Sequence, residues 1–292
     1  MQFLIPYPAF PESIMRDNVP GFPPTFPEVA ATKAHPPKKA SGKYPSRLFV
    51  GTATTILEWR STRSMTDPDF LRTGHQVYLR PGVMATRRSL PIITKPYARK
   101  PFSSKVDGES FANVFALHTF QSMRLDMESG SAVMRVPAMS GRQVLPGALG
   151  TMNDLFQVMR PANGWMLELG SGTDDVFTCG YRIYVSRDTL MVNKLRDIPG
   201  CCEGQRVYLM LAHLGASTLP SPKTPFLTVT MSAKQGLELV RLINRDLISA
   251  IHLDDYGVFL SQLDDFKKAV QDAGLSGKVV HLDQKGQYKF KA

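Results

Sequence analysis

The order of strand-like and helix-like segments is the feature that most constrains how this chain can fold. Short apolar segments with strand character follow one another through most of the sequence, beginning with Thr54–Trp59 and a hairpin partner at Thr62–Thr66. Two helical patterns come late: residues 231–243 repeat apolar side chains at helical spacing, and residues 262–273 follow a capping-box-like start at Ser261. Many strands followed by strand–helix alternation predict an α/β sandwich of mixed sheets.

The other predicted elements are short strands. They fall at residues 90–94, 111–117, 121–128, 132–138, 164–169, 181–185, 207–211, 248–252, 279–282 and 287–290. One longer apolar insertion, residues 147–163, suits either packing against the core or a lip that contacts substrate or membrane.

Residues 1–46 differ from the rest of the chain in their proline content. Ten prolines fall in this stretch, together with Lys38, Lys39 and Lys43. Proline removes a backbone donor and restricts the residue before it. We therefore predict a Pro-rich, basic, extended arm over residues 1–46, outside the layers of the core, and one domain over residues 47–292.

Positive charge is concentrated in the amino-terminal third. Residues 1–105 hold 16 lysines and arginines against 6 aspartates and glutamates, an excess equal to the net charge of +10 of the whole chain. Such a region attracts phosphate, nucleic acid or anionic lipid. Aromatic side chains do not alternate with the basic ones as they do in proteins that bind single-stranded nucleic acid. A solvated basic surface is therefore the simpler interpretation, and nucleic acid is not an expected partner.

The cysteines and the hydropathy pattern set the expected compartment. Cys201 and Cys202 are adjacent and cannot bridge without strain, and with Cys179 they form no Cys-x-x-Cys zinc motif. No apolar run reaches the roughly 18 to 20 residues that cross a bilayer as a helix. We therefore expect free thiols, no transmembrane segment and a soluble, cytoplasmic protein.

Four stretches together carry a resemblance to a known superfamily. They are Gly51-Thr-Ala-Thr-Thr-Ile-Leu-Glu58 with Thr66-Asp-Pro-Asp-Phe70, Pro137-Ala-Met-Ser-Gly-Arg-Gln143, Tyr184-Val-Ser-Arg-Asp-Thr-Leu190, and Ile251-His-Leu-Asp-Asp-Tyr256. In this order and spacing they resemble the metallo-β-lactamase fold superfamily. The branch they look most like contains N-acyl-phosphatidylethanolamine-hydrolysing phospholipase D and the ascorbate-6-phosphate lactonase-like proteins.

The resemblance implies a four-layer αββα sandwich with a dinuclear metal site, usually zinc, that activates water for hydrolysis. By resemblance, Asp188 takes the place of the bridging aspartate and His252 that of the last histidine, as vestigial metal ligands. Gln143 stands where a later histidine belongs, and an amide oxygen is a poorer zinc ligand than an imidazole nitrogen. Arg187 stands where the family usually has a small residue, and its charge could neutralise Asp188.

The family's His-x-His-x-Asp-His motif, which follows an early strand, is absent from this sequence. The family pattern would place it before residues 90–94, where only Arg88 and Ser89 stand, so we expect one strand–helix segment to be missing. Its loss would leave backbone groups unpaired and apolar surface exposed. Either the remaining strands or the arm close that gap, or the chain is unstable, or the gene model is incorrectly spliced.

Two ligands do not make a catalytic zinc site, which needs three and an open position. Asp188 and His252 are therefore expected to form a remnant hydrogen-bonded pair. The other histidines have no companion at i+2 or i+4 that would put two ligands on one face, and none is expected to bind metal. They are His35, His75, His118, His213 and His281.

Three functional hypotheses follow. The first is a degenerate member of the hydrolase family that lacks an efficient dinuclear metal site, with zinc weakly bound or absent. The second is an active metal-dependent hydrolase of a phosphodiester, ester or lactone, with a small-molecule or lipid-like substrate; it requires His75, His118 or Gln143 to join Asp188 and His252. The third is a basic, non-catalytic binding module that uses residues 1–105.

Overall fold

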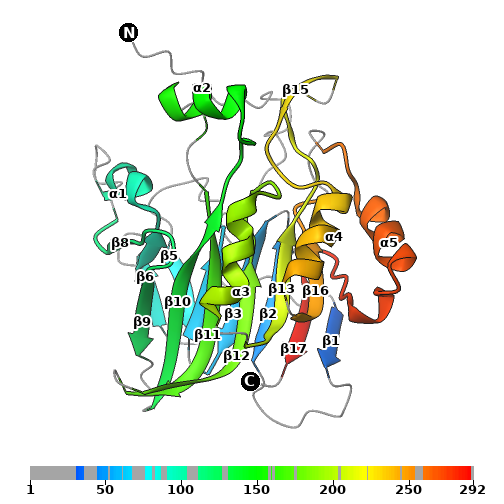
Figure 1. Ribbon diagram of the computed structural model, residues 1–292. Helices are drawn as coiled ribbons and strands as arrows, with labels where there is room; N and C mark the ends of the chain where they lie inside the picture. The colour runs from blue at the N-terminus through cyan, green and yellow to red at the C-terminus, as the bar shows by residue number, and fades with distance from the viewer. Residues whose placement is uncertain are drawn as a thin grey trace.

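Two β-sheets lie face to face in the computed structural model, and helices cover the outer face of one of them (Figure 1). The structure describes residues 31–35, 45–51, 53–60, 62–67, 76–80, 83–86, 91–103, 111–126, 131–156, 159, 162–173, 176–202, 205–221, 223–243, 245–253 and 259–290. The predicted mixed α/β sandwich is confirmed.

The first sheet has five strands in the order β1-β17-β2-β3-β4. These strands are β1 (Ala31–His35), β2 (Ser46–Gly51), β3 (Thr54–Trp59), β4 (Thr62–Thr66) and β17 (Gly286–Phe290). Strand β1 is parallel to β17, whereas β17, β2, β3 and β4 pair antiparallel, so the sheet is mixed. The last strand of the chain therefore lies inside this sheet, between two early strands.

Strand β1 belongs to the stretch predicted as an arm outside the core. Its backbone is extended, as proline-rich sequence favours, but it pairs with β17 and adds an edge strand to the sheet. Ser46, the last residue of the predicted arm, begins β2 and is buried. The division into an arm and a domain stays a prediction, because residues 1–30 and 36–44 lie outside the described part of the chain.

The second sheet has six strands in the order β16-β13-β12-β11-β10-β9. These strands are β9 (Ser122–Asp126), β10 (Ala132–Gly141), β11 (Ala162–Gly172), β12 (Phe177–Val185), β13 (Val207–His213) and β16 (Arg245–Ile251). Strands β16, β13 and β12 pair parallel to one another, whereas β12, β11, β10 and β9 pair antiparallel. Because β12, β13 and β16 run the same way, their carboxyl ends meet at one edge of the sheet.

Apolar side chains form one core on each face of the six-stranded sheet. One core lies between the sheets and includes Leu57 and Tyr288 from the first sheet and Ile183 from the second. The other includes Leu239 and Phe266 and is covered by the helices. These helices are η3 (Asn193–Asp197), α3 (Ile198–Cys201), α4 (Ala233–Leu242) and α5 (Leu263–Asp272), with η4 (Ser276–Lys278) after them.

The helices α4 and α5 confirm the two predicted helical segments, but their caps differ from the expected one. Ser261 does not cap α5, whose capping box is formed by Gln262 and Asp265. The Ser261 hydroxyl oxygen instead accepts a hydrogen bond from the backbone N–H of Ala233 at 3.1 Å, at the start of α4. Ser261 therefore ties the two helices together.

Three two-stranded units complete the described strands. They are β5 (Gln76–Arg80) with β6 (Val83–Thr86), β7 (Ile92–Thr94) with β8 (Val114–Ala116), and β14 (Thr218–Ser221) with β15 (Thr224–Thr228). The strand predicted at residues 279–282 is reduced to a single bridge between Val279 and Ile248.

The strands β7 and β8 lie next to the point where one strand–helix segment is expected to be missing. The two strands are parallel and are joined through α1 (Pro96–Ser103), so they form a strand–helix–strand unit. This unit follows directly after the point where the loss was placed, although Arg88 and Ser89 themselves lie outside the described residues. The strand predicted at residues 90–94 is therefore present as β7, and the loss of a segment before it stays a prediction.

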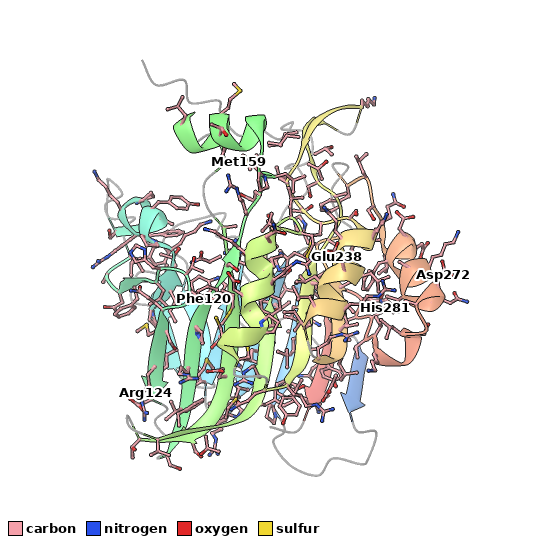
Figure 2. The ribbon with its side chains drawn as sticks, viewed as in Figure 1. Phe120, Arg124, Met159, Glu238, Asp272 and His281 are labelled. Carbon is pink, nitrogen blue, oxygen red and sulfur yellow. The ribbon has the colours of Figure 1, made fainter. Side chains whose placement is uncertain are left out.

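Part of the apolar insertion forms α2 (Ala148–Phe156) at one end of the sandwich (Figure 1). The Asn153 side chain holds the backbone of Met159 with two hydrogen bonds of 2.8 and 2.6 Å, and Met159 lies beside this helix (Figure 2). Met152 and Leu155 are 56% and 75% exposed, so these two side chains do not pack into the core. No helix among the described residues has the length and apolar character to cross a membrane.

Candidate functional site

Three polar residues follow the parallel strands of the six-stranded sheet. Asp188 comes shortly after β12, His213 ends β13, and His252 follows β16 directly. Because these carboxyl ends share one edge, the topology brings the three side chains together. His213 is buried, whereas Asp188 has a side chain that is 34% exposed.

The first sheet supplies a fourth member, Asp67, from the turn after β4. The Thr54 hydroxyl donates a hydrogen bond of 2.7 Å to the Asp67 carbonyl oxygen and fixes that turn. The Asp67 carboxylate is 8% exposed and forms an ion pair with the guanidinium of Arg187. Asp67 from the five-stranded sheet and Arg187 from the six-stranded sheet therefore meet at the edge of the sandwich. Arg187 pairs with Asp67 rather than directly with Asp188.

His213 lies between the two carboxylates. Its Nδ1 is 3.3 Å from Oδ1 of Asp188, within hydrogen-bonding distance, and its Nε2 is 3.8 Å from Oδ2 of Asp67. The backbone N–H of His213 donates to the Ser186 hydroxyl oxygen at 2.9 Å, which holds the strand end in place. His213 is not expected in this cluster from the sequence, because an isolated histidine after an apolar strand gives no local signal of its partners.

His252 is held differently from the expected remnant pair. Its Nδ1 is 3.0 Å from the carbonyl oxygen of Leu214 and 3.9 Å from Oδ1 of Asp188. A carbonyl oxygen can only accept, so this contact assigns the proton of the neutral ring to Nδ1. The predicted hydrogen bond between Asp188 and His252 is therefore corrected: Asp188 bonds to His213, and His252 bonds to the backbone.

Aromatic contacts fix the plane of the His252 ring. It stacks on the ring of His213 with 5.8 Å between centroids and meets Phe259 edge to face at 4.9 Å. Its side chain is only 14% exposed. The two imidazoles are therefore arranged side by side, with little freedom to rotate toward a new ligand.

Backbone strain is concentrated at this site. Asp67, Arg187 and His252 have φ values of 45°, 55° and 62°, in the left-handed region that side-chain-bearing residues rarely adopt. Such conformations persist where surrounding contacts hold them and are often found at functional sites. Here the contacts of the cluster itself hold the three residues.

The charges of the cluster keep Asp188 ionised. Burial by itself raises the pKa of Asp188, but the hydrogen bond from His213 and the nearby His252 and Arg187 outweigh burial and hold that pKa well below its usual range. Asp188 is thus a carboxylate at neutral pH.

Lys95 adjoins the same cluster from strand β7. Burial and the charge of Arg187 together lower the pKa of Lys95 to about 8, against the opposite effect of Asp188 and Asp67. Its ammonium also lies over the ring of Tyr97, 4.8 Å from the centroid. Lys95 is half-buried, so it and Asp188 are members of the cluster that solvent can reach.

The residues that follow strand β7 differ in type from the metal-binding motif of the family. The family pattern has a histidine- and aspartate-rich motif after such a strand, and this chain has Lys95-Pro-Tyr-Ala-Arg-Lys100. None of these six residues is a histidine or a carboxylate. Residues 95–100 therefore supply no ligand of these types to the cluster.

The other predicted positions do not join the cluster in the described contacts. Gln143 is half-buried after β10, next to Arg142, whose backbone N–H donates to the Thr189 hydroxyl oxygen at 2.8 Å. His118 is exposed in a turn between β8 and β9. His75 lies outside the described residues.

A dinuclear metal site does not fit these residues. Within the described part of the chain, no group of three or more His, Cys, Asp or Glu side chains is arranged to hold a metal ion. One oxygen of Asp67 bonds to a guanidinium, and Nδ1 of His252 donates to a carbonyl. A cation placed beside Asp67 would be repelled by Arg187 and would have to replace this ion pair, whereas the Nδ1 hydrogen bond of His252 leaves its Nε2 free.

Two mixed sheets in a sandwich, with helices on the outer face of one of them, form the architecture that the resemblance to the metallo-β-lactamase fold superfamily implies. Solved structures with a similar fold include a possible metal-dependent hydrolase from Veillonella parvula, with a TM-score of 0.60 and 14% identity over 84% of this chain and 98% of that one. An isothiocyanate hydrolase from Delia radicum gut bacteria has a TM-score of 0.59 and 12% identity over 85% of this chain and 100% of that one.

A third similar structure is a metallo hydrolase from the archaeon Ignicoccus hospitalis, with a TM-score of 0.57 and 13% identity over 85% of this chain and 99% of that one. The sequence itself matches no family of proteins and no curated protein. At these identities the likeness concerns the fold, and the chemistry has to be argued from the cluster.

Proposed function

We propose that this chain is a degenerate member of the metallo-β-lactamase-fold hydrolases, in which the chain's own cations neutralise the carboxylates of the ancestral metal site. The observation that carries this proposal is the ion pair between Arg187 and Asp67, with His213 placed between Asp67 and Asp188. Efficient dinuclear hydrolysis is then not its activity, and zinc binds weakly or not at all.

Electrostatics supports this proposal. Two divalent cations are stabilised by several anionic or neutral donors at bonding distance, and a guanidinium in the same group opposes them. Asp188 and Asp67 already have cationic or hydrogen-bonding partners, so metal binding would exchange existing contacts for new ones. Gln143, for its part, offers only an amide in place of an imidazole.

Restoring a small residue beside Asp188 tests the proposal. Arg187→Gly removes the guanidinium, and glycine accepts the φ of 55° without strain. We expect purified wild-type protein, supplied with zinc or iron, to retain well under one equivalent after desalting, and the variant to bind zinc more tightly by calorimetry. Arg60→Gly is the matched control, because Arg60 has a φ of 54° and lies in an exposed turn. Near two equivalents of tightly held metal in the wild type would end the proposal.

A second candidate is an active metal-dependent hydrolase of a phosphodiester, ester or lactone. The convergence of Asp188, His213 and His252 favours it, because these three residue types are all zinc ligands in other proteins. Chelator-sensitive turnover that disappears in both Asp188→Ala and His252→Ala would support this candidate. Turnover that neither substitution changes would reject it.

The narrower assignments belong to the same proposal. We infer a place near the phospholipase D and lactonase branch, a small-molecule or lipid-like ligand, and a cytoplasmic location. The four sequence stretches support the branch, and the free thiols of Cys179, Cys201 and Cys202 agree with a reducing compartment. Co-purification with lipid extracts followed by mass spectrometry would identify a lipid-like ligand.

A further inference from the structure

Arg47 is a charged residue placed deep between the two sheets. It lies on β2, the central strand of the five-stranded sheet, opposite Leu57 of β3 and Tyr288 of β17. Leu57 and Tyr288 belong to the apolar core between the sheets, and the whole Arg47 residue is 1% exposed. A guanidinium therefore lies inside a layer that is built mostly from aliphatic and aromatic side chains.

Only one nitrogen of this guanidinium donates a hydrogen bond to the described residues. Nη1 donates a hydrogen bond of 2.8 Å to the Ser249 hydroxyl oxygen on β16, in the opposite sheet. The described residues offer no hydrogen-bond acceptor to Nε or Nη2, although both atoms are buried. The Phe49 ring lies 5.6 Å from the guanidinium carbon and contributes a cation–π contact. Two donor nitrogens are thus left without a partner in the described structure.

The charge of Arg47 is also uncompensated. Burial lowers its pKa to about 9, and burial is the cause of this shift, with no charged group of the described residues contributing to it. The guanidinium therefore stays protonated at neutral pH. An unpaired buried charge is among the most unfavourable arrangements in a protein core, and a chain that folds around one normally supplies a counter-charge.

We propose that the core between the sheets binds one small monovalent anion, of the halide class, against Nε and Nη2 of Arg47. The Tyr288 hydroxyl is a further donor for this anion, because Tyr288 is the register partner of Arg47 and its buried oxygen has no partner among the described residues. One guanidinium carries one positive charge, so a monovalent anion neutralises it and a dianion would leave excess charge in the core. A water molecule would accept the hydrogen bonds but leave the charge unbalanced.

Thermal unfolding of the full chain at constant ionic strength tests the proposal. Chloride or bromide replaces gluconate, an organic anion too large for a tightly packed core. An anion that binds the folded state raises the unfolding midpoint with its concentration, and we expect a saturable rise on the order of 3 °C. Arg47→Met should lose this rise, whereas Arg206→Met, which removes an exposed arginine paired with Asp246, should keep it.

Crystals of the wild-type protein soaked in bromide give a second measurement that does not depend on a variant that folds. We expect an anomalous peak in contact with the Arg47 guanidinium. A water molecule or a carboxylate in that position would overturn the proposal, and so would an unfolding midpoint that does not respond to halide or responds equally in Arg47→Met.

Discussion

Asp188 keeps its negative charge because its neighbours stabilise the carboxylate more than burial destabilises it. The hydrogen bond from His213 and the nearby His252 and Arg187 act together on a side chain that is one third exposed. An ionised group with a lowered pKa stabilises the folded state wherever the unfolded state would bind the proton more readily.

The pH dependence of stability tests this account of Asp188. The pKa of the folded state lies below the unfolded value of about 3.9, so the contribution is fully present above pH ~4 and is lost as the pH falls through the folded pKa. We expect the difference in unfolding free energy between wild type and Asp188→Asn to shrink as the pH is lowered from 6 to 3, by urea titration. A constant or growing difference would contradict the assignment.

Arg187 neutralises the charge of Asp67, whose carboxylate is more deeply buried than that of Asp188. Removing it in Arg187→Ala leaves Asp67, which is 8% exposed, without its counter-charge. The arginine is 39% exposed, so solvent screens the pair, and we expect a loss of about 1–2 kcal/mol of unfolding free energy. The exposed pair of Arg196 and Glu238 is the control, and Arg196→Ala should cost less than about 0.5 kcal/mol. Equal losses of unfolding free energy in the two variants would show that the burial of Asp67 does not strengthen its pair with Arg187.

Lys95 should be unusually reactive toward amine-directed reagents. Burial and Arg187 lower its pKa to about 8 from the ordinary 10.5, so the neutral, nucleophilic amine forms near that pH. We expect the rate of Lys95 acetylation, followed by peptide mass spectrometry, to rise with pH and level off above an inflection near 8. The Lys95→Arg variant identifies the peptide signal, and an inflection near 10.5 would show that the cluster does not act on this lysine.

At the scale of elements, helix α4 is pressed against the strand end that carries the cluster. Gly236 lies on the inner face of α4, and a Cβ there would stand 2.4 Å from a methyl carbon of Leu214. Leu214 is fully buried, and its carbonyl accepts the hydrogen bond from His252. Glycine at this position therefore lets the helix approach the strand that orients His252.

Gly236→Ala should destabilise the protein even though alanine favours helix by about 1 kcal/mol. Overpacking a rigid core costs typically about 1–3 kcal/mol, and we expect a net loss of about 1–2 kcal/mol, measured by denaturant unfolding. Gly200 in α3 is the matched control, since a Cβ there meets nothing within 4 Å. A stabilised Gly236→Ala protein would show that the helix can move away from Leu214 at no cost.

At the scale of the whole molecule, strand β17 closes the five-stranded sheet. It lies between β1 and β2, and its residues Tyr288 and Phe290 are each 2% exposed in the core between the sheets. Burial of each aromatic side chain is worth about 1.5–3 kcal/mol, against a typical net stability of about 5–15 kcal/mol. The last strand of the chain thus contributes a large share of the stability of the sandwich.

Truncation before residue 286 should therefore abolish cooperative unfolding, observed as loss of a sharp thermal transition by circular dichroism. A chain that ends after Phe290 keeps all of β17 and is the control, and we expect it to unfold in one transition. A truncated chain without β17 that still melts sharply would show that the first sheet does not depend on it.

The third hypothesis, a basic binding module, also belongs to this scale. It depends on residues 1–105, and much of that range lies outside the described residues, so it stays a prediction. The structure does place part of the predicted arm, strand β1, against β17. Any test by deletion of residues 1–46 would therefore remove an edge strand as well as positive charge.

Most of the elements that local sequence patterns predicted are present in the structure, although the strand predicted at residues 279–282 is only a single bridge. The periodicity of residues 231–243 and 262–273 identified α4 and α5, and the alternation around residues 132–138 identified β10, because a side-chain period reports which face is buried. The resemblance drew attention to Asp188 and His252, which do lie in one cluster. Hairpins such as β5 with β6 and β14 with β15 were missed, since their short strands carry no clear alternation.

Tertiary structure alone decided which charges meet. Asp67 follows a hairpin of one sheet and Lys95 follows β7, whereas Arg187 follows β12 and His213 ends β13 in the other sheet. Ion pairs depend on strand order and on the packing of the sheets, which no local spacing records. The same reason applies to Arg47, whose position on β2 is ordinary in sequence and becomes informative only because the second sheet encloses it.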